Sequence, residues 1–221
     1  MKSKLAPTPH VKAQQEPAFD ARPKTPQAVK AHRGAGEVRI IGGQWRRTKL
    51  PVALKPGLRP TPDRVRETLF NWLGQSLVGW RCADVFAGTG ALGLEAASRG
   101  AAQVQLCEQD SALAAQLQAH LNRLQASHAS VFKGDGLSWL KQQSAGSLDV
   151  VFLDPPFDSP LFEPALMAAA HAVAADGWVY LEAPKLWSDD ALAPLGLHTH
   201  RYLKAGAVHA HLLRPVAVPI A

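Results

Sequence analysis

The sequence predicts an α/β fold with a doubly wound, mostly parallel sheet of seven strands. Three observations lead to this prediction. Short apolar runs alternate with helix-forming segments from residue 81 to residue 182, a glycine-rich turn follows the first run, and two prolines follow the fourth. Two further strands, over residues 197–203 and 208–213, are expected to add an antiparallel hairpin at one edge of the sheet.

The N-terminal part of the chain differs in charge from the rest. Residues 1–60 contain thirteen Lys and Arg against three Asp and Glu, whereas residues 61–221 contain eleven against fifteen. A basic segment of this kind favours a polyanionic partner, although a basic tail can also serve solubility alone. Residues 1–36 hold five prolines, few large apolar side chains and no periodic pattern, so they are predicted to be a disordered tail.

Residues 37–58 are predicted to form a small β-hairpin extension that contacts RNA. Residues 38–43 and 48–52 have the composition of two short strands on either side of a basic turn that carries Trp45 as an exposed aromatic. Clustered cations beside an aromatic ring favour contact with RNA over a hairpin that only packs on the main domain. The candidate RNA-binding residues of this segment are Arg39, Arg46, Arg47 and Lys49.

The main domain, residues 59–221, is expected to open with a helix. Thr61 is a suitable N-cap, with Pro62 at the first helical position, and apolar side chains then recur at helical spacing as far as Leu73. Three basic residues are expected at loop or solvent-facing positions, where they could bind phosphate or simply be solvated: Arg59, Arg64 and Arg66.

The first apolar run leads into a turn suited to a nucleotide-type cofactor. Residues 81–86 have the pattern of a buried strand, and the glycines of residues 87–93 let the backbone approach a ligand without a Cβ in the way. The next strand, residues 103–107, is followed by an acid at a position where carboxylates commonly bind ribose hydroxyls. The candidate cofactor residues here are Phe86, Gly88, Gly90 and Glu108.

Two cofactor classes fit this turn. The letters GxGxxG over residues 88–93 are those of a dinucleotide site. Asp84, four residues before the first glycine, gives instead the form D-x-F-x-G-x-G, which is typical of class I methyltransferases that use S-adenosylmethionine. A carboxylate there suits the cationic amino group of the methionine moiety and sits poorly beside a pyrophosphate. The sequence therefore favours S-adenosylmethionine.

An acid also follows the third strand of the predicted sheet. Residues 129–133 form this strand, after an amphipathic helix that starts near Asp110. Asp135 can accept a hydrogen bond from the adenine amine of the cofactor, can cap the helix that follows, or can do both. Gly136 completes this part of the predicted cofactor site.

The fourth strand, residues 148–153, is followed by Asp154-Pro155-Pro156-Phe157. Two prolines cannot continue a sheet ladder, because each lacks an N–H and has a fixed φ. The chain is therefore expected to form a rigid loop at the carboxyl end of a strand, where open α/β sheets bind ligands. A carboxylate, backbone carbonyls and an aromatic face suit the exocyclic amine of a stacked planar base. The alternative is a tight turn with a buried Phe157.

The two cysteines, Cys82 and Cys107, fall in predicted core strands without metal-type spacing and are expected to be reduced. No metal site is predicted. The sequence has no apolar run long enough to cross a bilayer and no recognisable signal sequence at its start, so no membrane association is expected. These features indicate a cytoplasmic protein.

Four stretches of the sequence resemble the RsmD family of RNA methyltransferases. They are residues 39–47, residues 58–71 with the sequence LRPTPDRVRETLFN, residues 84–93 and residues 154–157. The resemblance covers about residues 37–214, and residues 1–36 lie outside it. The turn at Arg46 and Arg47 departs from the family pattern, in which a glycine often precedes the arginine.

The resemblance implies a Rossmann-like class I methyltransferase that methylates N2 of guanine 966 in 16S ribosomal RNA with S-adenosylmethionine. Its substrate would be naked RNA or a small-subunit particle, and the protein would be a monomer. Asp154 and the Pro155 carbonyl would accept the two N–H bonds of the amine, and Phe157 would stack on the extruded base. Rival functions are methylation of adenine N6 in ribosomal RNA or DNA, and a catalytically silent RNA-binding assembly factor.

Overall fold

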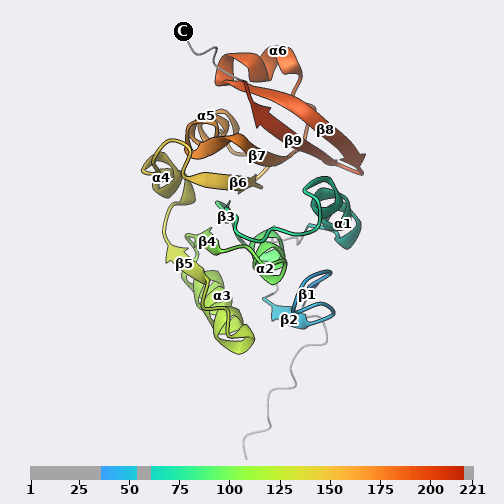
Figure 1. The fold of residues 1–221 in the computed structure, drawn as a ribbon, viewed down its shortest axis with the longest axis vertical. Helices are drawn as coiled ribbons and strands as arrows, with labels where there is room; N and C mark the ends of the chain where they lie inside the picture. The colour runs from blue at the N-terminus through green and yellow to red at the C-terminus, as the bar shows by residue number, and fades with distance from the viewer. Residues whose placement is uncertain (1–35, 54–60, 217–221) are drawn as a thin grey trace, which may run out of the picture. The chain divides into compact units, whose positions relative to one another are not determined.

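The computed structural model describes residues 36–53 and 61–216 (Figure 1). The tail predicted for residues 1–36 lies, up to residue 35, outside the described residues, and so does Arg59.

Within the described residues, seven strands form one sheet in the order β5-β4-β3-β6-β7-β9-β8. The strands are β3 (Arg81–Asp84), β4 (Gln103–Glu108), β5 (Ala129–Lys133), β6 (Leu148–Leu153), β7 (Val173–Ala183), β8 (Leu197–Ala205) and β9 (Val208–Pro215). Strands β3 to β7 run parallel, and β9 is antiparallel to both β7 and β8. The predicted parallel sheet with an antiparallel edge hairpin is confirmed.

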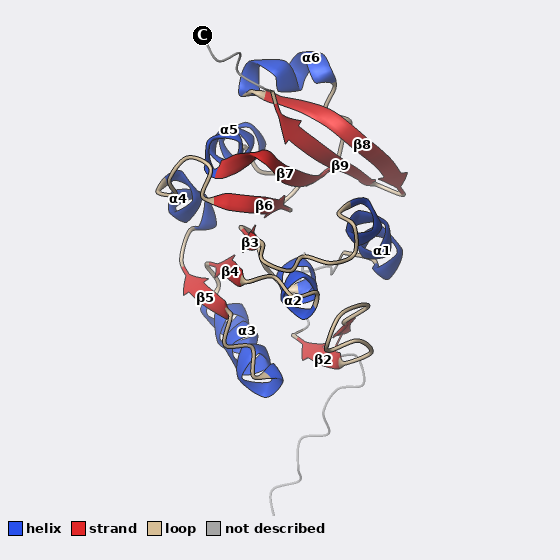
Figure 2. Cartoon of the chain, viewed as in Figure 1, coloured by secondary structure: helices blue, strands red, loops and turns tan. Residues whose placement is uncertain are grey.

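Helices cover both faces of this sheet (Figure 2). They are α1 (Asp63–Trp72), α2 (Ala91–Ser98), α3 (Ser111–Leu124), α4 (Gly136–Lys141), α5 (Phe162–Ala172) and α6 (Asp189–Leu192), with the short 3₁₀ helix η1 (Ala193–Leu195) after α6. Successive side chains of a strand point to opposite faces. In β6, Val150 and Phe152 therefore join the apolar cluster of α1, α2 and α3, whereas Val151 and Leu153 join that of α4, α5 and α6.

The start of α1 differs from the prediction. The sequence predicts Thr61 as the N-cap, but Pro62 occupies that position and no side chain caps the helix. The Thr61 side chain is buried and hydrogen-bonds Glu182 of β7 instead. A buried carboxylate needs donors, whereas the exposed first turn of a helix can be satisfied by water.

The N-terminal hairpin forms as predicted and packs tightly on α2. Its strands are β1 (Gly36–Arg39) and β2 (Lys49–Val52), which pair antiparallel. The backbone N–H groups of Ile41 and Gly42 donate to the Glu95 carboxylate of α2 at 2.8 and 2.7 Å. A Cβ on Gly43 would lie 1.8 Å from the Ser98 carbonyl oxygen, so this close approach of the turn to α2 requires glycine.

Arg66 does not lie on the solvent-facing side of α1, and the expectation that it reaches phosphate or water is wrong. Its side chain is 1% exposed and donates to the carboxylates of Asp63 and Glu95, at 2.5 and 3.4 Å. A further bond of 2.9 Å runs to the Arg39 carbonyl at the end of β1. Arg66 thus joins α1, α2 and the hairpin through charge-assisted hydrogen bonds.

Both cysteines are buried and free, as expected. Burial is the main cause that raises the pKa of each thiol, which leaves them in the unreactive protonated form at neutral pH. Among the helices of the described ranges, none combines the length and the apolar composition needed to cross a membrane.

The substitution Arg66→Met tests the buried network, because it removes the cation and keeps a side chain of similar length. We expect the free energy of unfolding to fall by about 3 kcal/mol, since the buried Glu95 then loses a charged donor. Arg64→Met, at an exposed position of the same helix, should change it by less than about 0.5 kcal/mol. Urea unfolding followed by circular dichroism measures both. Equal unfolding midpoints for the two variants would show that the network does not stabilise the fold.

Candidate active site

Acidic side chains gather at one edge of the sheet. The parallel strands end at this edge, and the acids at or just beyond their ends are Asp84, Glu108, Asp135, Asp154 and Glu182. Asp84 interacts electrostatically with Glu108 and Glu182, and Asp154 with both Asp84 and Glu182. In the part of the chain that the structure describes, no group of three or more His, Cys, Asp or Glu is arranged to hold a metal ion. The negative charge of these acids makes this edge suitable for a cationic ligand.

Two of these acids accept hydrogen bonds from the glycine-rich turn and from the start of α2. Gly88 and Gly90 adopt positive φ values of 50° and 77°. The Gly88 N–H donates to Glu108 Oε2 at 2.9 Å, and the Gly93 N–H, in the first turn of α2, donates to Asp84 Oδ2 at 2.8 Å. These bonds fix the turn between β3 and α2.

Asp84 lies deep in this edge, with 2% of its surface exposed. Burial raises the pKa of its carboxyl to about 7, against the lowering effect of the Gly93 N–H, and the charges of Glu108 and Glu182 raise it further. A cation bound beside Asp84 would favour the ionised form.

Asp135 is the N-cap of α4, as the sequence allows. Its side chain accepts hydrogen bonds from the Leu137 N–H at 3.1 Å and the Ser138 hydroxyl at 2.6 Å. A Cβ on Gly136 would lie 1.9 Å from the carbonyl oxygen of Val85, the residue after β3, so α4 can approach the chain here only at a glycine. Whether Asp135 also binds adenine stays a prediction.

The loop after β6 exposes its aromatic ring. Phe157 is 36% exposed and Pro156 is exposed, while Pro155 is buried and Asp154 is half-buried. The Pro156 carbonyl accepts the N–H and the hydroxyl of Ser159, at 3.0 and 2.6 Å, which closes the loop. The alternative of a tight turn with a buried Phe157 is therefore wrong.

Asp154 is the most strongly perturbed carboxyl of this loop. Burial holds its pKa well above the usual range, and the charges of Glu182 and Asp84 raise it further. The carboxyl thus has an increased affinity for a proton where the loop meets the acidic edge.

Glu182 is a further candidate site residue, which the sequence did not predict. It lies near the end of β7 and is 3% exposed. Its position one residue after Leu181, which pairs with Leu153, puts it beside Asp154 on the neighbouring strand. The signal was present, because Glu182 ends the fifth predicted parallel strand, but a lone acid at a strand end does not distinguish a site residue from a solvated one.

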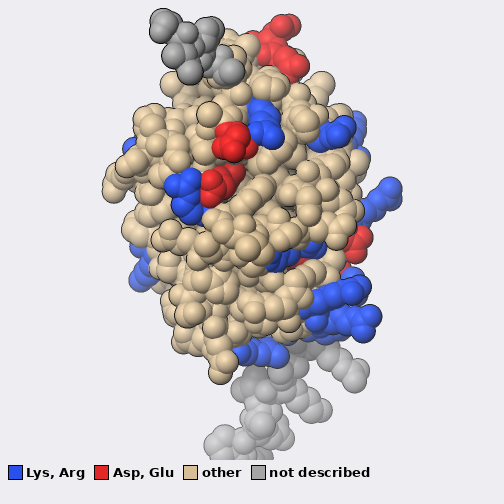
Figure 3. Space-filling view, viewed as in Figure 1, with Lys and Arg blue, Asp and Glu red and all other residues tan. Residues whose placement is uncertain are grey.

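The predicted RNA-binding cations lie mainly on the hairpin and the start of α1. Lys and Arg side chains gather in Figure 3 around the region where Figure 1 shows the hairpin. Arg39 pairs with Asp63 at 2.6 Å and Lys49 with Glu37 at 2.7 Å, all of them partly exposed. Within the described ranges, the exposed side chains that form no ion pair include Arg46, Arg47 and Arg64.

Two details of the hairpin turn differ from simple expectation. Trp45 is half-buried and stacks on His128, with ring centroids 5.8 Å apart, so the prediction of an exposed aromatic is wrong. Arg47 has a φ of 70°, in the region that favours glycine, at the turn where the sequence departs from the family pattern. The turn therefore offers charge rather than a stacking platform.

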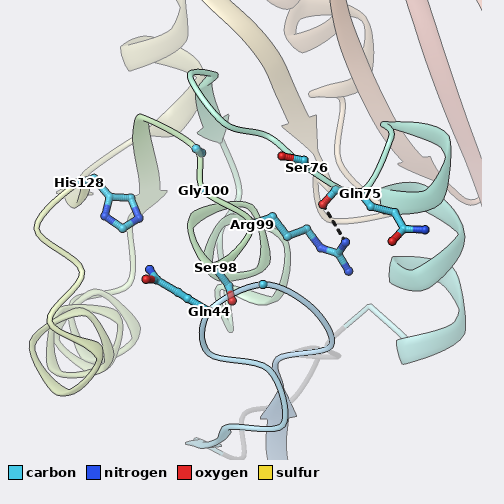
Figure 4. A pocket seen from close by; sticks show the side chains of 9 residues that line it. Gln44, Gln75, Ser76, Ser98, Arg99, Gly100 and His128 are labelled. Carbon is cyan, nitrogen blue, oxygen red and sulfur yellow. Dashed lines mark hydrogen bonds between the residues drawn. The ribbon is translucent and has the colours of Figure 1, made fainter.

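A cavity lies beside this turn, and none of the predicted site residues lines it. It is lined by Gly43, Gln44, Gln75, Ser76, Ser98, Arg99, Gly100, Ala101 and His128 (Figure 4). Arg99 crosses it to donate to the Gln75 carbonyl at 3.0 Å. The lining residues at the end of α2 lie just before β4 begins, at the amino edge of the sheet. The cavity is thus at the opposite edge from the acids.

Several known proteins are similar to this chain over most of its length. Ribosomal RNA small subunit methyltransferase D of Escherichia coli K12 is 49% identical over 152 residues, which cover 69% of this chain and 74% of that protein. The enzyme of the same name from Haemophilus influenzae is 47% identical over 155 residues, covering 68% and 80%. The solved structure of yhhF from Escherichia coli, named as a methyltransferase, superposes with a TM-score of 0.69 at 39% identity and covers 82% of this chain and 100% of that one.

A family model described as "conserved hypothetical protein 95" matches residues 38–214, which include the hairpin, the glycine-rich turn and the loop after β6. The fold, the arrangement of these segments and the similarity over most of the chain agree. This protein belongs to the RsmD family of ribosomal RNA small subunit methyltransferases.

Proposed function

We propose that this protein transfers a methyl group from S-adenosylmethionine to the exocyclic N2 of a guanine in 16S ribosomal RNA. The observation that carries the proposal is the loop Asp154 to Phe157, which offers a carboxylate and an exposed ring beside the acid-lined glycine turn. The names of the relatives support ribosomal RNA as the substrate. The reaction would take place in the cytoplasm, with the protein acting as a monomer.

The acidic edge fits S-adenosylmethionine by the chemistry of its groups. Asp84 would face the methionine ammonium group. Glu108 accepts one backbone N–H on each oxygen, from Gly88 and Asp110, so among the described residues it keeps lone pairs for ribose hydroxyls. Asp135 would accept from the adenine amine. Phe86 and Gly136 would border the same site. The bound cofactor would supply an activated methyl group on a sulfonium.

The loop after β6 would orient the target amine. Guanine N2 is conjugated with its ring and is a poor nucleophile, so its lone pair must be aimed at the methyl group. Asp154 and the Pro155 carbonyl would accept its two N–H bonds, and Phe157 would stack on the base once it leaves the RNA stack. Such orientation can contribute an effective molarity of about 10⁵ M.

The hairpin and α1 would bind the RNA backbone. Arg46, Arg47 and Arg64 are exposed and free of ion pairs among the described residues, whereas Arg39 and Lys49 would exchange a protein carboxylate for a phosphate. Arg59 is proposed on the sequence alone.

Tritium transfer from labelled S-adenosylmethionine tests the function. Small-subunit RNA from cells lacking this protein is offered naked and as a particle, and the products are analysed as nucleosides. We expect N2-methylguanosine, and the better substrate form shows when the enzyme acts. Label on N6-methyladenosine would move the target to adenine, and the absence of label with cofactor still bound would indicate a silent RNA-binding factor.

The variant Asp154→Ala removes the acceptor for the target amine. We expect methyl transfer to fall at least about 10³-fold, because orientation of N2 and acceptance of its proton are both lost. Isothermal titration should still detect binding of S-adenosylmethionine. Turnover near that of the wild type would rule out the role given to Asp154.

The affinity for S-adenosylmethionine should depend on pH through Asp84. Its carboxyl has a pKa of about 7 in the free protein and would be ionised beside the bound ammonium group, so binding releases a proton below that pH. The affinity should therefore fall as the pH drops below about 7, by at most about tenfold per pH unit for this group.

Calorimetry on Asp84→Asn measures how much of the pH dependence of the affinity comes from this one carboxyl. The variant should bind more weakly and with a smaller pH dependence, the remainder belonging to Asp154. Asp149→Asn, a carboxylate at the amino end of β6, is the matched control and should behave as the wild type. An unchanged slope in Asp84→Asn would contradict the assignment.

The hairpin cations should contribute to RNA affinity through phosphate contacts. We expect Arg46→Ala and Arg47→Gly together to weaken RNA binding about tenfold or more at physiological salt and to reduce the salt slope by between one and two. Glycine is chosen at Arg47 because its φ of 70° suits that residue. Lys141→Ala, an exposed cation of α4, is the control. Filter binding over a salt series measures both, and equal slopes would exclude the hairpin from the interface.

A further inference from the structure

A buried carboxylate beside the proposed catalytic loop has no role in the function described so far. Glu182 lies on β7, where its neighbour Leu181 pairs with Leu153 of β6. Asp154 follows Leu153, so the two acids leave adjacent parallel strands side by side at the same edge. Glu182 is 3% exposed and Asp154 is half-buried. Two carboxylates this close cannot both ionise freely away from water.

The two acids differ in the donors that they receive. The Tyr180 hydroxyl donates to Glu182 Oε1 at 2.9 Å, and the Thr61 side chain also hydrogen-bonds Glu182. The positive charge of Arg66 acts on Glu182 as well. Among residues 36–53 and 61–216, no donor hydrogen-bonds the Asp154 carboxyl. The ionised form is therefore stabilised on Glu182, and Asp154 is left as the member open to a ligand.

The neighbouring charges and burial also favour ionisation of Glu182 before that of Asp154. Burial raises the pKa of both carboxyls, but hydrogen bonds from Tyr180 and Thr61 and the charge of Arg66 oppose this rise at Glu182. At Asp154 the neighbouring charges are Glu182 and, from β3, Asp84, and both add to the effect of burial. The proton held by the pair therefore resides on Asp154.

We propose that Asp154 and Glu182 form a carboxylate pair in which the anionic Glu182, held by Thr61 and Tyr180, makes Asp154 the acceptor of the proton that guanine N2 loses. This inference rests on the proposed function. The reactive form is the one in which Asp154 has lost its own proton and both carboxyls are ionised. In this form the N2 lone pair forms the new bond to the methyl carbon, the electrons of the broken S–C bond remain on sulfur, and the N2 proton passes to the ionised Asp154 Oδ. Asp154 later gives the proton to water. Glu182 is a positioning residue, since it acts through Asp154.

The test compares the wild type with Glu182→Gln, which removes the charge and keeps an oxygen acceptor for the two hydroxyls. Carbon-13 NMR of carboxyl-labelled aspartate in the cofactor-free protein follows the titration of Asp154. We expect its midpoint to fall by about one pH unit or more in the variant. The acid limb of the single-turnover methylation rate should move down by the same amount, with a plateau about tenfold lower and an unchanged KM for RNA.

Two further variants separate this role from a structural one. Asp149→Asn loses one carboxylate from the amino end of the same strand and should leave both the titration and the pH profile of Asp154 as they are in the wild type. Asp154→Asn is the reciprocal variant, with glutamate labelled in place of aspartate. In it the midpoint of Glu182 should stay at the wild-type value, because Asp154 already carries its proton at the pH where Glu182 titrates. A fall of the Glu182 midpoint in Asp154→Asn would show the opposite order of ionisation and overturn the inference, and this measurement remains if Glu182→Gln does not fold.

The outcomes distinguish the inference from the function on which it rests. If the wild type methylates guanine but Asp154 titrates at the same pH with and without the Glu182 charge, the carboxylate pair is wrong and the function stands. If Glu182→Gln lowers the rate at every pH by the same factor, Glu182 is structural only. If the wild type methylates no guanine while the NMR shifts occur, the pair exists and the proposed function fails.

Discussion

The placement of the hairpin, α1 and α2 depends on the hydrogen bonds that the buried Glu95 carboxylate accepts. It is fully buried and accepts hydrogen bonds from the backbone of Ile41 and Gly42 and from the side chains of Arg66 and Arg99. An ionised carboxylate without such donors would cost several kcal/mol in the protein interior. The hairpin turn, α1 and the end of α2 must therefore adopt positions that satisfy it together. Since α2 begins at the glycine-rich turn, the proposed RNA-binding surface and the proposed cofactor site both adjoin α2.

The parallel sheet brings the candidate site residues together. Parallel strands send their carboxyl ends to one edge, and five of them do so here, so acids far apart in the sequence become neighbours. The glycine turn and the proline loop follow β3 and β6, which pair directly. A cofactor bound along the first and a base bound by the second would lie against adjacent strands. Methyl transfer would then need no large movement of the scaffold.

Local patterns predicted most of the fold, because burial in a strand or helix shows in the spacing of apolar residues along the sequence. The same patterns predicted the glycine turn and the proline loop, whose residues are contiguous. Partners distant in sequence leave no such trace. The sequence predicted Thr61 as a helix cap and Arg66 as a surface cation. Both side chains instead hydrogen-bond buried carboxylates on other elements. Trp45 was predicted to be exposed, but its ring stacks on the ring of His128.

The carboxylates at the edge are costly to the free protein and useful to the complex for the same physical reason. Burial raises the pKa values of Asp84, Asp154 and Glu182, so the free site carries less negative charge than its acids suggest. A cation that enters the edge offsets this penalty and favours ionisation. The negative charge then appears where the cation binds, without rearrangement of the backbone. Transfer of the methyl group neutralises the sulfonium and moves its positive charge to the guanine amine beside Asp154, at the step in which that amine must lose a proton.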